Sequence, residues 1–175
     1  MAGTERGVTE PEATFSACFG AAFLTLHPLR YAALLREKLD AHGSAVYLVN
    51  TGWSGGSAAG GASRMSIAAT RACVDAVLDG SIAELSRAAA DNGGGGDSEC
   101  PYFETDPVFG FKVPRRLGLD ASPSASIPLL PREAWSDPDA YDAARLELAA
   151  MFVENFKKYD ENGSTGLANH GPMLK

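Results

Sequence analysis

The fold of this chain is decided by residues 46–78, which read VYLVNTGWSGGSAAGGASRMSIAATRACVDAVL. A short apolar run ends in a polar turn that carries Trp53, passes into a Gly-rich loop, and restarts as a helical pattern opened by Arg64. Strand, Gly-rich loop and helix in this order are typical of a nucleotide-contacting loop in an α/β protein. A phosphate-gripping P-loop is excluded, because that motif needs Lys followed by Ser or Thr and residues 60–64 read GGASR.

Helices with clear end signals are predicted on both sides of the loop. Pro28 suits the first turn of a helix that ends at Gly43. Ser66 is suited to cap the helix that follows the Gly-rich loop, and this helix is predicted to run until Gly80. A last long helix is predicted over about residues 138–159. The apolar side chains expected on the inner faces of these three helices are Tyr31, Leu34, Leu35 and Leu39, then Ile67, Val74, Val77 and Leu78, then Tyr141, Leu148, Met151, Phe152 and Phe156.

Strands are predicted at residues 45–49 and 109–113, where apolar residues form a short run or alternate along the chain. Together with the helices they predict an α/β fold. Three segments are predicted to be irregular: a Gly-rich hinge or insertion at 92–96, a Ser/Pro-rich loop at 121–131, and a loose tail at 162–175.

Small and apolar residues dominate residues 13–26. This composition is typical of buried structure, packed against something that is not part of this chain. We therefore expect four side chains of this segment to be exposed in the chain alone: Phe15, Phe19, Phe23 and Leu24.

The length, charge and cysteine content of the chain limit the cellular compartments and the classes of partner that are expected. A length of 175 residues suffices for one domain with a real core, and the net charge of -7 argues against nucleic acid as a partner. Cys18, Cys73 and Cys100 are odd in number and far apart, which predicts a reducing compartment rather than disulfides. No apolar run reaches membrane-spanning length, and residues 1–11 are unlike a signal peptide. A cytoplasmic location without membrane contact is expected.

Local motifs for catalysis are absent from the sequence. There is no Ser/His/Asp or Cys/His pattern, and the acidic residues are scattered without a metal-ligand arrangement. His27 precedes a predicted helix and is interpreted as a capping or packing residue rather than a base. Trp53 has two interpretations, core packing or a ligand platform, and its neighbours Asn50 and Thr51 favour the second.

Several longer motifs carry a specific resemblance. The segments AGTERGVTEP, FSACFGAAFLTLHP, YLVNTGWSGG and RMSIAATRACVDAVLDGSI occur in this order. They resemble the C-terminal part of the ATP-dependent phosphoenolpyruvate carboxykinase family, and PREAWSDPDAYD and LAAMFVENFKKY resemble its final helical region. The resemblance covers nearly the whole chain, but well under half of a family member.

The resemblance implies a function in gluconeogenesis. Family members convert oxaloacetate and ATP to phosphoenolpyruvate, carbon dioxide and ADP, using Mg²⁺ and Mn²⁺. By match to the family's adenine-side motif, Arg64, Met65 and Thr70 would contact the base and sugar of ATP. The family's catalytic residues and metal ligands lie upstream of the matched region, so none is expected in this chain.

The resemblance also implies an incomplete C-terminal nucleotide-binding domain of the carboxykinase fold over residues 1–161, followed by the tail at 162–175. Because residues 1–7 match the interior of the family's catalytic domain, we expect the chain to be part of a longer protein. Three hypotheses stay open: the adenine-side part of an enzyme, a non-catalytic truncated paralogue that binds nucleotide, and a module that pairs with a full-length subunit or with the missing N-terminal half.

Overall fold

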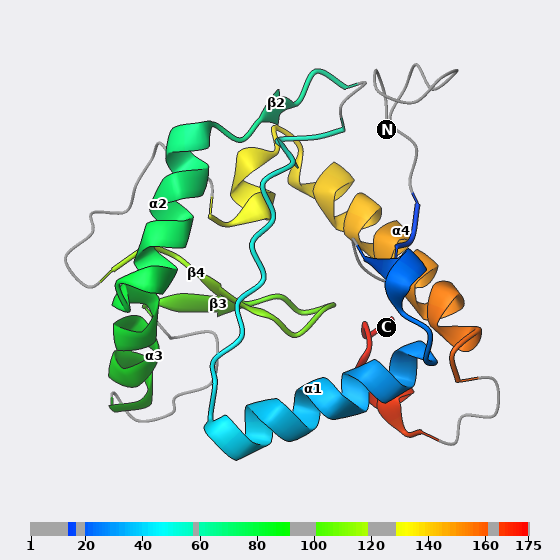
Figure 1. The fold of residues 1–175 in the computed structure, drawn as a ribbon. Helices are drawn as coiled ribbons and strands as arrows, with labels where there is room; N and C mark the ends of the chain where they lie inside the picture. The colour runs from blue at the N-terminus through cyan, green and yellow to red at the C-terminus, as the bar shows by residue number, and fades with distance from the viewer. Residues whose placement is uncertain are drawn as a thin grey trace. The chain divides into compact units, whose positions relative to one another are not determined.

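The computed structural model of the chain describes residues 14–16, 20–57, 60–91, 101–118, 129–160 and 165–174 (Figure 1). The described residues form α-helices, short 3-10 turns and two antiparallel sheets of two strands each. They divide into two compact units. The first unit comprises Met1–Leu48 and Phe152–His170, and the second comprises Val49–Met151 and Gly171–Lys175.

In the first unit, helix α1 spans Pro28–His42, with the proline at its first position as the sequence predicts. The His27 side chain caps the helix, since its Nδ1 accepts a hydrogen bond from the Leu29 N–H at 3.3 Å. Gly43 ends the helix in the left-handed region with a φ of 61°. The His27 ring also packs edge-on against Tyr159, with 6.2 Å between ring centres. The predicted capping and packing role of His27 is therefore confirmed.

The segment before α1 contains the 3-10 turn η1, Ala21–Phe23. Its large side chains are exposed, as expected: Phe15 by 41%, Phe23 by 87% and Leu24 by 40%. Phe19 lies outside the described residues. Apolar surface of this extent has to be covered by something else if it is not to cost free energy in water.

The second unit holds two consecutive helices, α2 (Ile67–Leu78) and α3 (Ser81–Asp91), which pack against each other. Gly80 adopts a φ of 88°, which allows the sharp turn between them. Asp79 Oδ1 also holds this turn, because it accepts a hydrogen bond from the Ser81 N–H at the start of α3 at 2.8 Å. Helix α2 is predicted from the sequence, and α3 is not.

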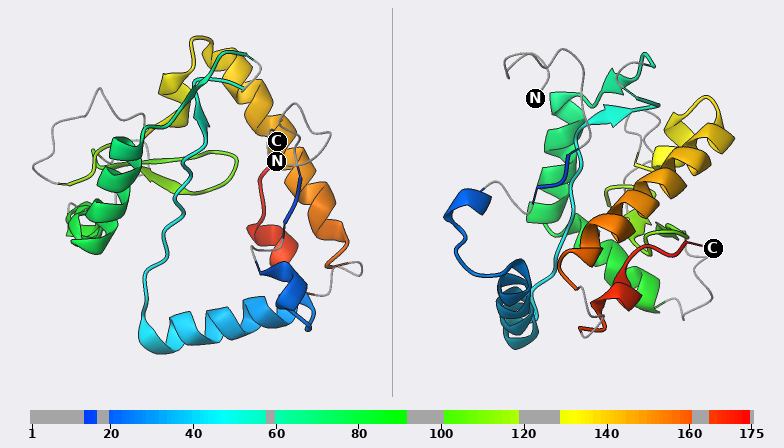
Figure 2. Two further views of the ribbon diagram at one scale, coloured as in Figure 1. Left: turned by 45° about the horizontal axis from the view of Figure 1, so that its top comes forward. Right: turned by 90° about the vertical axis from the view of Figure 1, so that its right-hand side faces the viewer.

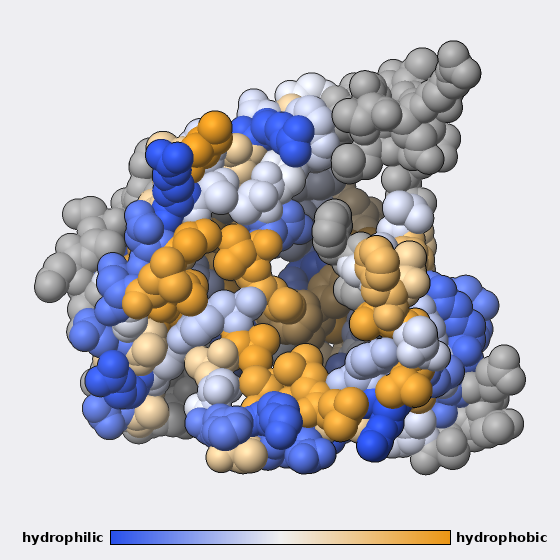
Figure 3. Space-filling view, viewed as in Figure 1, coloured by the Kyte–Doolittle hydropathy of each residue, from blue (hydrophilic) through white to orange (hydrophobic). Residues whose placement is uncertain are grey.

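The buried face of α2 differs from the predicted one. Ala69 and Ala76 are buried, together with Ile82 and Leu85 of α3. Three of the large side chains expected to face inward are exposed: Ile67, Val74 and Leu78. Apolar side chains are accordingly visible on the surface over α2 (Figure 3). The small alanines let the helix backbone approach its neighbours closely, and the fully buried Leu85 fills the volume.

Strands β3 (Phe103–Thr105) and β4 (Lys112–Pro114) form an antiparallel hairpin in which Phe103 lies opposite Pro114. The predicted strand at 109–113 is thus wrong in its first half, because Phe109 lies in the turn. The cause is local, since Asp106 Oδ1 accepts a hydrogen bond from the Phe109 N–H at 2.7 Å and holds the turn.

Helix α4 spans Pro138–Lys157 and is unbroken in both further views (Figure 2). Asp137 caps it, accepting hydrogen bonds from two amides of the first turn at 2.9 and 3.2 Å. The predicted helix is confirmed, ending two residues before the predicted end. Its buried residue is Ala149, whereas Leu148 and Phe152 are exposed by 42% and 43%. The expectation that these two face inward is therefore wrong for the chain as it stands.

The predicted strand at 45–49 is not formed. Residues 44–50 carry no regular structure, and Val46, Leu48 and Val49 are exposed by 62%, 76% and 48%. A strand needs a neighbouring backbone to receive its hydrogen bonds, and within the described residues no strand pairs with this segment. The described structure is α/β in the broad sense of mixed helices and small sheets.

Two further 3-10 turns complete the described structure, η3 (Pro131–Ala134) and η4 (Leu167–His170). Two of the three predicted irregular segments, 92–96 and most of 121–131, lie outside the described residues. The predicted loose tail at 162–175 is described over 165–174, where it contains η4 and where the Met173 N–H donates a hydrogen bond to the Val108 carbonyl at 2.7 Å. Among the helices that are described, none combines the length and apolar character needed to cross a membrane.

Candidate functional site

The segment singled out by the sequence forms a small hairpin before α2. Strand β1 (Trp53–Ser54) pairs antiparallel with β2 (Ser63–Arg64), and Trp53 lies opposite Arg64. We call the described residues 53–57 and 60–64 the Trp53 hairpin. The pairing continues by one residue, because the Met65 N–H donates to the Gly52 carbonyl at 3.0 Å.

The expectation that Arg64 opens the helix is wrong. Arg64 is a strand residue, and α2 begins at Ile67 with Ser66 as its cap. Ser66 Oγ accepts a hydrogen bond from the Ala69 N–H at 3.1 Å, so the predicted cap is confirmed. Ser66 also has extended backbone, which ends the helix on that side.

The nearest aromatic partner of Arg64 is across the hairpin. Its Cζ lies 5.8 Å from the centre of the Trp53 ring, which is within the range of a cation–π contact. Trp53 is 50% exposed, so its interpretation as a core residue is wrong. Both side chains present open surface to the solvent.

The three residues expected at the adenine side lie along β2, the short link after it, and the first turn of α2. Arg64 ends β2 and is exposed, Met65 follows it and is half-buried, and Thr70 is half-buried in the first turn of α2. The Thr70 N–H donates to the Ser66 carbonyl at 3.0 Å, which fixes its backbone in the helix. The structure thus places the guanidinium, the thioether and the hydroxyl on consecutive elements.

Two amides of the described part of the Gly-rich loop, those of Gly60 and Ala62, are hydrogen-bonded within the loop. The Gly60 N–H donates to Ser57 Oγ and to the Ser57 carbonyl at 3.1 and 3.0 Å, and the Ala62 N–H donates to the same carbonyl at 3.2 Å. A phosphate-binding loop instead aims free N–H groups at its ligand. The geometry of these amides agrees with the absence of a P-loop sequence.

Gly55 is required by close packing. Its φ is 84°, and a Cβ at this position would stand 2.8 Å from the carbonyl oxygen of Ala134 in η3. No real side chain fits at that distance, so the loop of the Trp53 hairpin and η3 touch through their backbones.

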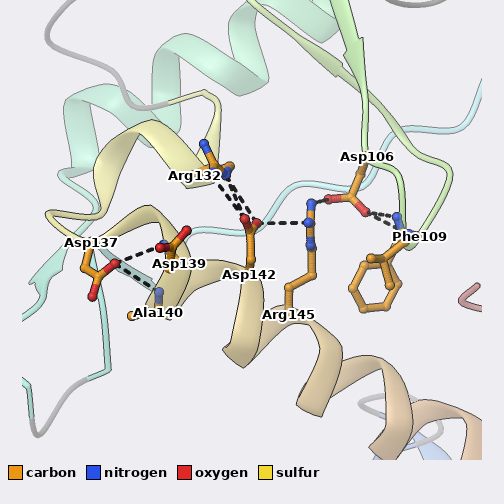
Figure 4. A network of polar contacts seen from close by, with 9 residues as sticks. Asp106, Phe109, Arg132, Asp137, Asp139, Ala140, Asp142 and Arg145 are labelled. Carbon is orange, nitrogen blue, oxygen red and sulfur yellow. Dashed lines mark hydrogen bonds and ion pairs between the residues drawn. The ribbon is translucent and has the colours of Figure 1, made fainter. Parts of the chain in front are cut away.

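A polar network that the sequence does not predict joins η3 to α4 and to the β3–β4 turn (Figure 4). The Arg132 guanidinium binds the Asp142 carboxylate through Nε at 3.2 Å and Nη2 at 3.0 Å. Arg145 binds Asp142 at 2.9 Å and Asp106 at 3.2 Å. The Arg145–Asp106 pair is well protected, with both side chains 14% exposed.

The network shifts the titration of its members. Hydrogen bonds from Arg132 hold the pKa of the Asp142 carboxyl below its ordinary value. Burial raises the pKa of the Tyr141 hydroxyl, and the negative charge of Asp106 raises it further. Only the spacing of Asp142 and Arg145, three apart on one helix, was visible in the sequence. Asp106 is 39 residues away from Arg145 in the chain.

No candidate metal site is found in the part of the chain that the structure describes. No three His, Cys, Asp or Glu side chains come together there in a way that could hold one. Cys73 is a free, half-buried thiol whose pKa is raised by burial, which makes it a poor nucleophile or ligand.

Comparison with known proteins decides the family. The family model described as phosphoenolpyruvate carboxykinase matches residues 1–119. The chain belongs to the ATP-dependent phosphoenolpyruvate carboxykinase family. The resemblance found in the motifs is thereby confirmed.

Relatives from distant organisms carry the same name, phosphoenolpyruvate carboxykinase (ATP). The protein of Sulfurimonas denitrificans is 51% identical over 100% of this chain, and that of Thermus thermophilus is 46% identical over 100%. The protein of Candida glabrata is 42% identical over 99% of the chain. The chain spans only 29% of the Sulfurimonas denitrificans and Thermus thermophilus proteins and 28% of the Candida glabrata protein.

Proposed function

We propose that this chain supplies the adenine side of the ATP site of a phosphoenolpyruvate carboxykinase that converts oxaloacetate and ATP to phosphoenolpyruvate, carbon dioxide and ADP. The observation that carries the proposal is the exposed Arg64 guanidinium on β2, directly before α2. Family membership supports the reaction class, and the strand, loop and helix arrangement supports a nucleotide as the ligand.

The chemistry of the three side chains suits adenosine. A planar guanidinium is able to stack on a purine face, and the exposed Trp53 ring, whose centre lies 5.8 Å from the Arg64 Cζ, would help to orient it. The Met65 thioether offers an adaptable apolar wall, and the Thr70 hydroxyl is able to hydrogen-bond a base edge or a sugar oxygen.

The triphosphate and the metal ions are proposed to be held elsewhere. The loop amides of Gly60 and Ala62 are engaged within the loop, and the chain has no Lys-Ser or Lys-Thr pair after its glycines. Mg²⁺ and Mn²⁺, which would neutralise charge on the transferred phosphoryl group, belong in this proposal to the part of the enzyme that this chain does not match. The chain alone is therefore expected to be inactive.

The test is a chimera in which this chain replaces the matching stretch of the Sulfurimonas denitrificans enzyme. The chimera should form phosphoenolpyruvate from oxaloacetate, ATP and Mn²⁺, and the 175-residue chain alone should not. In the chimera, Arg64→Ala should raise KM for ATP and leave KM for oxaloacetate unchanged. Arg71→Ala, an exposed arginine on α2, is the matched control and should change neither. An equal rise for both substrates would reject the adenine-side role.

A second candidate function is favoured by the exposed apolar side chains. Phe23, Val46 and Leu48 are exposed by 87%, 62% and 76%, which suits a module that pairs with another polypeptide. The proposed occupant is the part of the enzyme that this chain does not match. Sedimentation of the chain with and without the unmatched part of the Sulfurimonas denitrificans enzyme tests this. A heterodimer supports the pairing, and a chain that stays monomeric in the mixture refutes it.

A further inference from the structure

The Trp53 hairpin and η3 approach each other closely at Gly55 and Ala134. Gly55 has no room for a Cβ, because that atom would stand 2.8 Å from the Ala134 carbonyl oxygen. Backbone against backbone is a stiff contact, since no side chain lies between the two segments to adjust. The position of η3 therefore limits where the loop of the Trp53 hairpin is able to lie.

Turn η3 is anchored at both ends. Leu130 precedes it and is buried, with 7% of its surface exposed. Trp135 follows it and packs edge-on against the Tyr141 ring, with 5.7 Å between ring centres. Between these apolar anchors, Arg132 makes the polar one by binding Asp142 of α4.

The Arg132–Asp142 pair has the forked geometry with which an exposed ion pair is able to fix the orientation of the segments it joins. The guanidinium engages both carboxylate oxygens, at 3.2, 3.2 and 3.0 Å. Asp142 is held in turn by Arg145, which also binds the protected Asp106. Isolated surface pairs contribute little, whereas a forked pair inside a network fixes orientation.

Asp106 ties the network to the β3–β4 turn. Its Oδ1 accepts hydrogen bonds from the Val108 and Phe109 N–H groups at 2.9 and 2.7 Å, and its Oδ2 faces Arg145. Hydrogen bonds and ion pairs thus connect this turn through α4 to η3. From η3, the Ala134 carbonyl faces Gly55 of the Trp53 hairpin so closely that a Cβ does not fit between them.

We propose that Arg132 and Asp142 are positioning residues that hold the Trp53 hairpin, and with it Arg64, in place through η3. They do not touch the nucleotide. Their effect on ATP binding rests on the proposed function, whereas their effect on the hairpin itself does not.

The first test reads the hairpin without any ligand. The chain has two tryptophans, so the protein labelled with 5-fluorotryptophan gives two fluorine resonances, which Trp135→Phe assigns. Arg132→Ala and Arg132→Lys should both shift or broaden the Trp53 resonance. Lysine keeps the charge but not the fork, so it should not rescue the hairpin. Should Arg132→Ala fail to fold, Arg132→Lys and Asp142→Asn still decide the question.

The matched control is another arginine–aspartate pair. Arg36 and Asp40 of α1 lie 3.8 Å apart, and both side chains are at least 74% exposed. Arg36→Ala should leave the Trp53 resonance unchanged. A Trp53 resonance that stays unchanged in Arg132→Lys and Asp142→Asn would overturn the proposal, whatever their melting temperatures.

The second test is a double-mutant cycle in the Sulfurimonas denitrificans chimera with ATP as the probe. Arg132→Ala should raise the dissociation constant for ATP about threefold or more, and this effect should vanish when Arg64 is already Ala. Persistence of the full effect in the Arg64→Ala background would show that Arg132 does not act through Arg64, and would contradict the proposal.

The proposed nucleotide site and the proposed positioning role are refuted by different results. A Trp53 resonance that moves while neither Arg64→Ala nor Arg132→Ala changes ATP affinity refutes the nucleotide site and keeps the positioning role. An ATP affinity that falls with Arg64→Ala but not with Arg132→Ala refutes the positioning role and keeps the nucleotide site.

Discussion

Arg64 of β2 lies opposite Trp53 of β1, and its Cζ is 5.8 Å from the centre of the indole ring. The contact with Trp53 gives Arg64 a structural role in the hairpin, in addition to its proposed role in ligand binding. An exposed cation–π contact stabilises a hairpin by about 0.5–1 kcal/mol. Ligand binding and hairpin stability therefore have to be measured separately.

A double-mutant cycle measures the structural part. Arg64→Ala and Trp53→Ala should each lower the free energy of unfolding, with a coupling of about 0.5–1 kcal/mol between them. Urea denaturation of the four proteins, followed by circular dichroism, gives the coupling. A coupling of zero would mean that the two side chains do not interact in solution.

Gly55→Ala should be destabilising. The φ of 84° costs a residue with a Cβ about 1–3 kcal/mol, and the new Cβ meets the Ala134 oxygen. Gly20→Ala is the matched control, because a Cβ there meets nothing within 4 Å. Urea denaturation compares the two variants. Equal effects would show that Gly55 is not constrained as described.

Leu85→Ala should be the most damaging truncation on the helical pair. Leu85 is fully buried, and removing its methyl groups leaves a cavity that costs about 2–5 kcal/mol. Leu78→Ala, at a leucine that is 78% exposed, should change stability by no more than about 0.5 kcal/mol. A similar melting temperature for the two variants would contradict the described packing of α2 and α3.

Acid should weaken the Arg132–Asp142 pair. The folded state lowers the pKa of Asp142 below its ordinary value of 3.8, chiefly through the hydrogen bond from Arg132. The stability from this group is therefore fully present above pH 3.8 and is lost as the pH falls through the lowered folded value.

Unfolding measured at several pH values below 5 tests this prediction against Asp142→Asn. The difference in stability between the two proteins should shrink as the pH falls. A difference that stays constant across this range would show that Asp142 titrates normally in the folded state.

Local signals predicted the helix ends well. Pro28 and Gly43 mark α1 because each acts through its own backbone geometry, and Ser66 caps α2 through an amide three residues away. Such signals need no knowledge of the rest of the chain. The family followed from long motifs in order, which is also information that the sequence holds.

Features that depend on distant partners were missed. The segment 45–49 is apolar like a strand, but a strand forms only where another backbone pairs with it. The Asp106–Arg145 pair joins residues 39 apart, and no local pattern announces it. The burial of Ala149 rather than Leu148 in α4 likewise depends on what packs against the helix. The adenine-side roles of Arg64, Met65 and Thr70 stay predictions.

The most direct test of the central claim compares two ligands on the Sulfurimonas denitrificans chimera by calorimetric titration, with and without Arg64→Ala. ATP carries the adenosine group, and inorganic tripolyphosphate carries only the phosphates. If Arg64 contacts the adenosine group, Arg64→Ala weakens ATP binding by about 1–2 kcal/mol, the scale of a partly desolvated cation–π contact, and leaves tripolyphosphate binding unchanged. An equal loss for both ligands, or unchanged ATP affinity, would contradict this contact.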